Sequence, residues 1–231
     1  MKLPISSRLL ACCDFVRPGD RVADIGTDHG YLGIHLLQTG VAASVIASDI
    51  NRQPLESALR NAMKYGVRDR MSFYISDGAC AIPRDFDTLV CAGMGADTMM
   101  HILDSAPWLQ DSRYRLILQC QSRRPELRRY LCAHGYRITR ETLAQDGKFI
   151  YPIMEVVYAP GQMLSGAQLH LSPALLESGS PLLGAFYDRV VEGMRTTVAG
   201  LSRSGGEKYE EYREILTELE QLEEQIHGNR C

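Results

Sequence analysis

The stretch that decides the fold is Val22-Ala23-Asp24-Ile25-Gly26-Thr27-Asp28-His29-Gly30, in which a short strand-like run leads directly into an acidic turn with two glycines. Glycine adopts backbone conformations that other residues avoid, and it allows a ligand to approach the main chain. A helix is expected from about His29 to Gln38, and its first N–H groups would lack partners within the helix. A strand, a glycine turn and a helix in this order are typical of an α/β nucleotide-binding site.

The segments around this turn repeat the alternation of strand and helix. Strands are expected at residues 22–25, 44–48, 71–75, 86–92 and 114–119, helices at 6–16, 29–38, 53–65, 96–103 and 125–132, and a terminal β pair at 136–143 and 149–158. Parallel neighbours need a crossover of helix length, so the alternation predicts an α/β fold with a Rossmann-like, doubly wound, mostly parallel sheet over residues 1–160. Ligands of such sheets bind at the carboxyl ends of the strands.

The pattern changes after Pro160-Gly161, and from about Pro181 apolar residues recur every three or four positions. The segment Ser204-Gly205-Gly206 suits a tight turn between two such runs. This spacing predicts a C-terminal helical domain over residues 161–231, an antiparallel hairpin that resembles a two-helix coiled coil. Such a hairpin could pack, dimerise or hold a substrate, so a monomer and a weak homodimer both remain open.

The composition is that of an ordinary soluble protein. The 231 residues are 45% hydrophobic and 23% charged, and they can form one sizeable domain with an appendage or two small domains. No apolar run approaches the roughly 20 residues of a membrane span. The N-terminus lacks the hydrophobic core of a signal peptide, so we expect a cytoplasmic protein with no membrane partner.

The seven cysteines are odd in number, contain no C-x-x-C pair and mostly lie in apolar stretches. This pattern favours buried free thiols over disulfides or zinc ligands, and we expect no metal site. Cys120 ends a predicted strand, where sites are often built, although an unreactive thiol is the more frequent outcome.

The net charge of −3 conceals a local asymmetry. Residues 113–140 contain eight arginines and one acid, Glu126, whereas residues 207–231 contain eight glutamates and three basic residues. A guanidinium fork matches phosphate oxygens in a bidentate way. The arginine run therefore predicts phosphate contacts, with a solvated helix face as the alternative; the candidates are Arg123, Arg124, Arg128 and Arg129.

Polar or small residues also stand at the ends of the other predicted strands. Asp24 suits a cationic amino-acid group, and Asp49, at the next strand end, suits ribose hydroxyls. Asp77 could accept from an adenine amino group, and small residues after the fourth strand leave room for a ligand. The nicotinamide and phosphate-loop glycine motifs are absent. The residues predicted to bind a nucleotide-like cofactor at these strand ends, called the donor site below, are Asp24, Gly26, Thr27, His29, Asp49, Ile50, Asp77, Gly78, Ala92, Gly93, Met94 and Gly95.

The segments D-I-G-T-D-H and A-G-M-G, together with Leu116-Ile117-Leu118-Gln119 and Asp146-Gly147-Lys148, resemble the bacterial tRNA (adenine-22-N1)-methyltransferase family. The order and spacing fit from about Ser6 to the C-terminus. The resemblance implies a class I methyltransferase domain, S-adenosylmethionine as methyl donor, tRNA as substrate and a C-terminal coiled coil that helps to hold it. The chain departs from the family at Cys120-Gln121, where Pro-Asn is usual, and at Gly33, where Pro is usual; both lie near the expected target-base pocket.

Methylation of adenine N1 needs little acid–base chemistry, because N1 has an in-plane lone pair and the sulfonium methyl is electrophilic. Catalysis would come from holding the extruded base in line with the methyl group. Asp28 is the catalytic candidate, since its carboxylate could accept from the adenine N6 amino group; its alternative role is a helix cap near His29. The substrate-binding candidates are Arg8, Tyr31, Gln119, Arg123, Arg124 and Arg128.

Two alternative functions remain open from the sequence. The first is a methyltransferase that acts on another RNA position, a protein or a small molecule, which the acidic net charge and Cys120-Gln121 would suit. The second is a noncatalytic tRNA-binding protein that retains the fold. A nicotinamide-linked oxidoreductase is disfavoured, because the motif G-x-G-x-x-G is absent.

Overall fold

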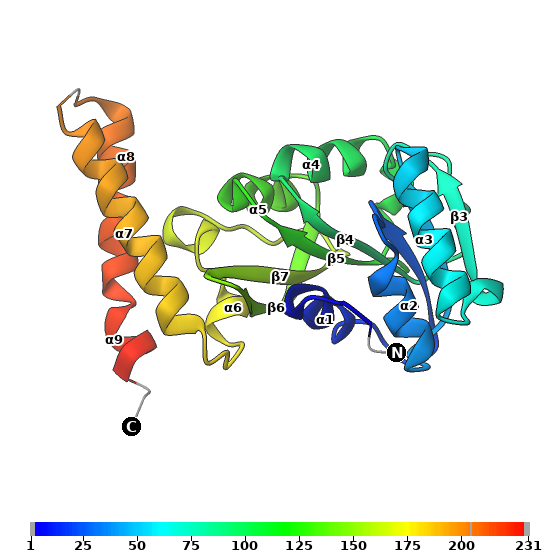
Figure 1. Cartoon of the computed structure of the whole chain (residues 1–231). Helices are drawn as coiled ribbons and strands as arrows, with labels where there is room; N and C mark the ends of the chain where they lie inside the picture. The colour runs from blue at the N-terminus through cyan, green and yellow to red at the C-terminus, as the bar shows by residue number, and fades with distance from the viewer. Residues whose placement is uncertain (1–2, 204, 229–231) are drawn as a thin grey trace.

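The computed structural model describes residues 3–203 and 205–228, and it consists of a sheet with helices on both faces and a helical tail (Figure 1). Ser204 of the predicted turn, Arg230 and the thiol of Cys231 lie outside the described residues. Within the described part, no helix is both long and apolar enough to cross a bilayer. No group of three or more His, Cys, Asp or Glu side chains in these residues could hold a metal ion.

The sheet has seven strands in the order β3-β2-β1-β4-β5-β7-β6. The first five of these are parallel, and β7 runs antiparallel to both β5 and β6. The strand order reverses between β1 and β4, which is the switch point where such sheets bind ligands. The predicted fold class, an α/β fold with a mostly parallel sheet, is confirmed. The strands are β1 Asp20–Ile25, β2 Ala42–Asp49, β3 Met71–Ile75, β4 Thr88–Met94, β5 Arg115–Cys120, β6 Tyr136–Asp146 and β7 Phe149–Tyr158.

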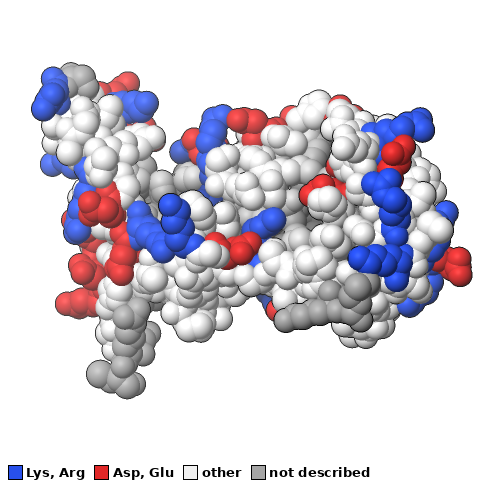
Figure 2. All heavy atoms as spheres, viewed as in Figure 1, with Lys and Arg blue, Asp and Glu red and all other residues white. Residues whose placement is uncertain are grey.

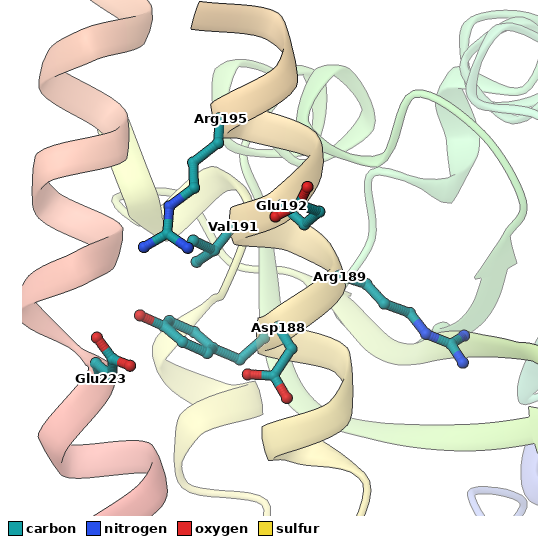
Figure 3. A pocket seen from close by; sticks show the side chains of 7 residues that line it. Asp188, Arg189, Val191, Glu192, Arg195 and Glu223 are labelled. Atoms are coloured by element: carbon teal, nitrogen blue, oxygen red, sulfur yellow. The ribbon is translucent and has the colours of Figure 1, made fainter. Parts of the chain in front are cut away.

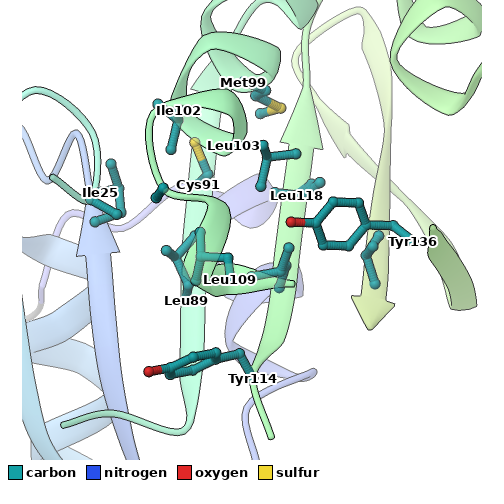
Figure 4. Close-up of a cluster of buried hydrophobic side chains, with 14 of the residues drawn as sticks. Ile25, Leu89, Cys91, Met99, Ile102, Leu103, Leu109, Tyr114, Leu118 and Tyr136 are labelled. Carbon is teal, nitrogen blue, oxygen red and sulfur yellow. The ribbon is translucent and has the colours of Figure 1, made fainter. Parts of the chain in front are cut away.

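The helices that join the strands cover the two faces of the sheet. In the body these are α1 Ser7–Cys13, α2 Tyr31–Gln38, α3 Arg52–Lys64, α4 Ala96–Asp104 and α5 Arg124–Ala133, with short 3-10 turns at Arg68–Arg70 and Pro107–Leu109. One core cluster joins α4 and α5 to the sheet, and Figure 4 shows Met99, Ile102 and Leu103 of α4 packed near Cys91 and Leu118. A second cluster joins α1, α2 and α3 to the opposite face.

The alternation of side chains along a strand decides which residues face α1 and α2. Val22, Val90 and Ile117 are buried in the cluster beneath these helices. The residue two places further along each strand lies on the same face. Asp24, Ala92 and Gln119 therefore lie at the carboxyl ends of their strands, on the face of the sheet that α1 and α2 cover. The register of the sheet therefore brings polar strand ends from three strands to one corner of the molecule.

The tail consists of the segments Gly166–Leu169 (3-10), α6 Pro173–Leu176, α7 Leu183–Leu201, α8 Glu207–Gln221 and α9 Glu223–His227. The helices α7 and α8 lie side by side as an arm beyond the edge of the sheet (Figure 1). Their apolar stripes form a third cluster with Leu143 and Ile150 of the β6–β7 hairpin. The carboxylate of Glu218 accepts from the Ala167 N–H at 2.8 Å, which fastens α8 to the segment before α6.

The six described cysteines are free thiols. Cys12, Cys13, Cys91 and Cys120 are buried, as expected from the apolar stretches around them, whereas Cys80 is exposed and Cys132 is half-buried. Burial raises the pKa of Cys120, and its thiol donates to the Ser122 carbonyl at 3.0 Å. A protonated, bonded thiol is a poor nucleophile, so Cys120 has a structural role.

Candidate functional site

The strand end of β1 holds a carboxyl group away from water. Asp24 is only 4% exposed, and its Oδ2 accepts from Thr27 Oγ1 at 2.7 Å. Burial raises the pKa of Asp24 to about 6, with the Thr27 hydrogen bond acting in the opposite direction and the charge of Asp49 adding to the rise. A desolvated carboxylate of this kind gains most from a cationic partner, such as the ammonium group of an amino acid.

The turn after β1 is fixed by its main chain. The N–H groups of Gly26 and Thr27 both donate to the Ser48 carbonyl, at 2.8 and 3.0 Å, which ties the turn to the end of β2. Asp28 has a φ of 48°, in the left-handed region. Its side chain is 72% exposed, and Oδ1 lies 3.7 Å from His29 Nε2.

The helix-cap role of Asp28 is wrong. Helix α2 begins at Tyr31 rather than near His29, and its N-cap is Gly30, with a φ of 73° and no side-chain cap bond. Asp28 therefore stands two residues before the cap, in a backbone conformation that directs its side chain to solvent. Its carboxylate is left available for another group.

The glycines at the strand ends make room for protein side chains. A Cβ atom on Gly26 would clash with the methyl group of Met94, and one on Gly93 would lie 3.2 Å from Arg8 Nη1. Both glycines have positive φ, 72° and 88°. The loops after β1 and β4 thus pack tightly against each other and against α1. The Cβ side of each glycine is occupied by the end of a flexible side chain, Met94 or Arg8, and the approach of a ligand to these loops remains a prediction.

The ends of β2 and β3 combine a carboxylate with two exposed apolar side chains. Asp49 accepts from the Asn51 N–H at 2.8 Å and is the register partner of Ile75. Ile50 and Ile75 are 60% and 52% exposed. An apolar surface beside an acid suits a nucleoside, whose base needs a flat contact and whose ribose needs an acceptor. Ile75 was missed from the sequence, although an apolar residue at the last position of a strand is a readable signal.

The third strand end continues this edge. Asp77 follows β3 and has its Oδ2 3.2 Å from His101 Nε2 of α4. Gly78 has a φ of 54° and packs against Ile102. The predicted donor-site residues Asp24, Asp49 and Asp77 therefore stand at the carboxyl ends of three adjacent strands.

Gln119 of β5 connects the carboxyl end of β4 to α1. It is fully buried, and its Oε1 accepts from the Gly93 N–H at 3.0 Å and from Arg8 Nη1. The pairing of β4 and β5 shifts between Ala92 and Met94, which forms a bulge at this point. The structure thus brings together Arg8, Gln119 and Gly93, three residues predicted from distant parts of the chain.

Three of the four arginines predicted to contact phosphate have other partners. Arg128 is fully buried, pairs with Glu141 and donates to the Leu169 carbonyl at 3.0 Å, so it cannot meet a phosphate at the surface. Arg123 is exposed but donates to both oxygens of Asp97, at 2.7 and 2.9 Å.

Arg129 is exposed and makes no hydrogen bond or ion pair among the described residues, so it stays a candidate phosphate contact. The other candidates are engaged in contacts. The guanidinium of Arg124 lies 5.2 Å from the ring centroid of Phe186, and burial lowers the pKa of this arginine. The rings of His29 and Tyr31 stack at 5.5 Å beside the turn. Arg8, His29 and Tyr31 therefore remain candidates at the strand ends, and Arg128 is excluded.

Two of the hollows among the described residues lie beside the turn and in the tail. A pocket of about 570 Å³ opens between the turn and the start of α3, lined by Asp28, His29, Asn51, Arg52, Gln53, Pro54 and Ser57. A second pocket of about 530 Å³ lies in the tail between α7 and α9 (Figure 3), lined by Tyr187, Asp188, Arg189, Val191, Glu192, Arg195 and Glu223. The tail pocket is far from the strand ends, and its Arg195 is paired with Glu220 at 2.8 Å.

Several proteins with similar sequences or structures are methyltransferases. The tRNA (adenine(22)-N(1))-methyltransferase of Bacillus subtilis is 32% identical over 149 residues, 64% of this chain and 63% of that enzyme. A relative from Mycoplasma genitalium is 33% identical over 138 residues, 58% of this chain and 61% of its own length. The chain thus covers somewhat less than two thirds of the length of these curated relatives.

Solved structures agree over almost the whole chain. A Streptococcus pneumoniae protein in complex with S-adenosyl-L-methionine superposes with a TM-score of 0.82 at 25% identity, covering 95% of this chain and 99% of that one. The B. subtilis m1A22 tRNA methyltransferase has a TM-score of 0.78 at 24% identity, with 98% and 99% covered. The family model described as a methyltransferase domain matches residues 5–154. Since this match spans well over half of the residues, the chain belongs to the methyltransferase-domain family.

Proposed function

We propose that this chain transfers a methyl group from S-adenosylmethionine to N1 of an adenine in tRNA. The observation that carries the proposal is the row of carboxylates Asp24, Asp49 and Asp77 at three adjacent strand ends, beside the turn that leads into α2. The likeness to the B. subtilis enzyme of that activity supports the choice of base and substrate. The cytoplasm, where tRNA is found, is the proposed location.

The residues at the strand ends fit the donor. The buried carboxylate of Asp24 suits the ammonium group of the methionine part, and Asp49 suits the ribose hydroxyls. The exposed side chains of Ile50 and Ile75 offer an apolar surface to the adenine, and Asp77 an acceptor for its amino group. When bound, S-adenosylmethionine supplies the electrophilic methyl group.

Asp28 is the residue that we propose for catalysis. Its exposed carboxylate caps no helix and stands on the turn that joins Asp24 to α2. In this place it can accept from the N6 amino group of the target adenine, which orients N1 and stabilises the positive charge that develops on the ring. Arg8, held by Gln119, and the stacked His29–Tyr31 pair are the proposed walls for the target nucleotide.

Basic side chains near the turn support contact with RNA. Figure 2 shows a group of them over α3, which carries exposed Arg52, Arg60 and Lys64. Arg52 also lines the pocket beside Asp28. We propose these residues and exposed Arg129 as phosphate contacts in place of Arg123, Arg124 and Arg128, which are paired or buried.

A transfer assay tests the proposal. The chain is incubated with radiolabelled S-adenosylmethionine and unmodified tRNA transcripts that carry either adenine or guanine at position 22. We expect label in the first transcript and none in the second. Equal labelling of the two would contradict the choice of position 22, and labelling of protein fractions instead of tRNA would favour a methyltransferase with another substrate.

A further inference from the structure

The hairpin formed by β6 and β7 extends beyond the carboxyl end of β5. Pairing between β5 and β7 ends at Leu118 with Met154, whereas β6 and β7 remain paired as far as Asp146 with Phe149. Strand β5 itself ends two residues later, at Cys120. At about 3.4 Å per residue, the tip of the hairpin therefore projects roughly 10 Å past the strand ends that form the site.

The exposed face of this tip is the face on which the site lies. Ile153 is buried in the cluster beneath α1 and α2. Because side chains alternate along a strand, Tyr151 and Phe149 lie on the same face as Ile153, and this is also the face of Gln119. The tip is tied to the site through α1, because Ser7 Oγ donates to the Gln145 carbonyl and the adjacent Arg8 bonds to Gln119.

An aromatic ring and a cation stand together at this tip. Phe149 is 53% exposed, and its ring centroid is 6.1 Å from that of Tyr151. The Nζ of Lys148 lies 5.4 Å from the centroid of the Phe149 ring. Among the described residues, the other exposed large hydrophobic side chains are aliphatic, so Phe149 is the exposed phenyl ring of the molecule. The ring is partly covered by Tyr151, and the rest of its surface meets water and is open to a partner.

We infer that Phe149 and Lys148 form a nucleotide-binding tip, in which an unpaired base of the substrate tRNA stacks on Phe149 and Lys148 contacts an adjoining phosphate. The inference rests on the proposed function and names a contact outside the donor pocket. Stacking of a base on an aromatic ring is sequence-tolerant, which suits an enzyme whose target base must leave its own stack. The pairing of an aromatic ring with a cation favours nucleic acid over a purely apolar partner, and a second copy of the chain is an outcome of the test.

The test compares three variants by the kinetics of methyl transfer to tRNA. For Phe149→Ala we expect the KM for tRNA to rise about tenfold, as loss of one stacked base predicts, with little change in the affinity for S-adenosylmethionine. Phe149→Trp should keep a KM close to that of the unmodified chain. Met163→Ala is the matched control, because Met163 is 88% exposed in a loop remote from the strand ends and its loss should leave KM unchanged.

A direct binding signal accompanies the kinetics. Trp108 is the single tryptophan of the chain, and it packs against Phe86 and Tyr114. New fluorescence in Phe149→Trp therefore reports on position 149, and we expect tRNA to quench it.

An unchanged KM for tRNA in Phe149→Ala, or no quenching of Phe149→Trp by tRNA, would overturn the inference. The proposed function would still stand if the unmodified chain methylated tRNA. A shift from dimer to monomer in Phe149→Ala on light scattering would also overturn it, by showing that a second copy covers the ring. If the unmodified chain methylated no tRNA, the proposed function itself would fail.

Discussion

Asp24 shows how one residue can link the energetics of the fold to the chemistry of the site. Its carboxyl group is buried with a single side-chain partner, Thr27, and its pKa is raised to about 6. The protein keeps a group in an environment that disfavours its charged form. That cost is recovered only when a cation arrives, so the residue is better explained by binding than by stability.

The first prediction concerns the pH dependence of donor binding. Because the donor carries positive charge and needs ionised Asp24, its affinity should fall as the pH drops below about 6. Calorimetric titration with S-adenosylmethionine between pH 5 and 8 measures this. Asp24→Asn should bind weakly and with little pH dependence; tight binding by this variant would contradict the role of Asp24.

The second prediction concerns the stability of the donor-free protein, which the raised pKa of Asp24 makes fall, rather than rise, with increasing pH. The folded state binds the Asp24 proton more tightly than the unfolded state, so this group lowers the stability of the donor-free protein as the pH rises from about 4 to 6. Asp24→Asn should therefore stabilise the donor-free protein at pH 7 by about 1–3 kcal/mol and have little effect at pH 4. Thermal unfolding at the two pH values checks both; a loss of stability at pH 7 would be the contrary result.

The third prediction separates catalysis from donor binding. Asparagine tolerates the left-handed conformation of residue 28, so Asp28→Asn removes the charge without straining the turn. We expect kcat to fall on the order of 100-fold or more with donor affinity nearly unchanged. Asp49→Ala should instead weaken the donor. Equal loss of kcat and donor affinity in Asp28→Asn would remove Asp28 from the catalytic role.

The sequence allowed the acids at the strand ends to be predicted because each directly follows a recognisable strand. It did not reveal what fills the space beside the glycines, since Met94 and Arg8 reach Gly26 and Gly93 only through the packing of separate loops. The role of Arg128 was hidden for the same reason. Its partner Glu141 lies on the next strand, and the Ser172 hydroxyl that bonds to Glu141 lies 31 residues further along.

At the scale of elements, the arginine run divides between the two sides of α5. Leu127, Arg128 and Leu131 form its buried face, and Arg124 lies over Phe186 of α7. The charges of this helix thus hold the tail against the sheet. The glutamates of α8 carry acidic charge along the tail (Figure 2), which disfavours contact of that helix with phosphate.

The fourth prediction tests the buried ion pair of α5. Arg128→Ala leaves Glu141 buried without its cation and should destabilise the protein by about 3–5 kcal/mol. The double variant Arg128→Met, Glu141→Leu should recover much of this loss, because no unpaired charge remains. Denaturant unfolding measures both, with exposed Arg129→Ala as the control. A double variant no more stable than Arg128→Ala would contradict the account.

At the scale of the whole molecule, the alternation of strands and helices was enough to predict the parallel sheet. The order β5-β7-β6 at its edge was not readable, because it depends on a long hairpin that inserts its second strand beside β5. For the same reason, the sequence did not predict that the tip of this hairpin extends beyond the strand ends. Periodicity reports which face of an element is buried, whereas strand order depends on contacts between segments distant in the chain.

The fifth prediction concerns the oligomeric state. The apolar stripes of α7 and α8 are buried against each other and against the β6–β7 hairpin, so little apolar surface of the arm is left for a partner. We expect a monomer at micromolar concentration. Light scattering coupled to size exclusion measures the mass, and a stable dimer would show that the arm has a second apolar surface.

The central claim is that the strand-end site directs methyl transfer to N1 of an adenine. The most direct measurement is digestion of tRNA to nucleosides at neutral pH, after reaction with the chain and isotopically labelled S-adenosylmethionine, followed by mass spectrometry. The account predicts labelled 1-methyladenosine, located at position 22 and formed on the order of 100-fold more slowly with Asp28→Asn. Label in another nucleoside, or in no nucleoside while tRNA still binds, would contradict it.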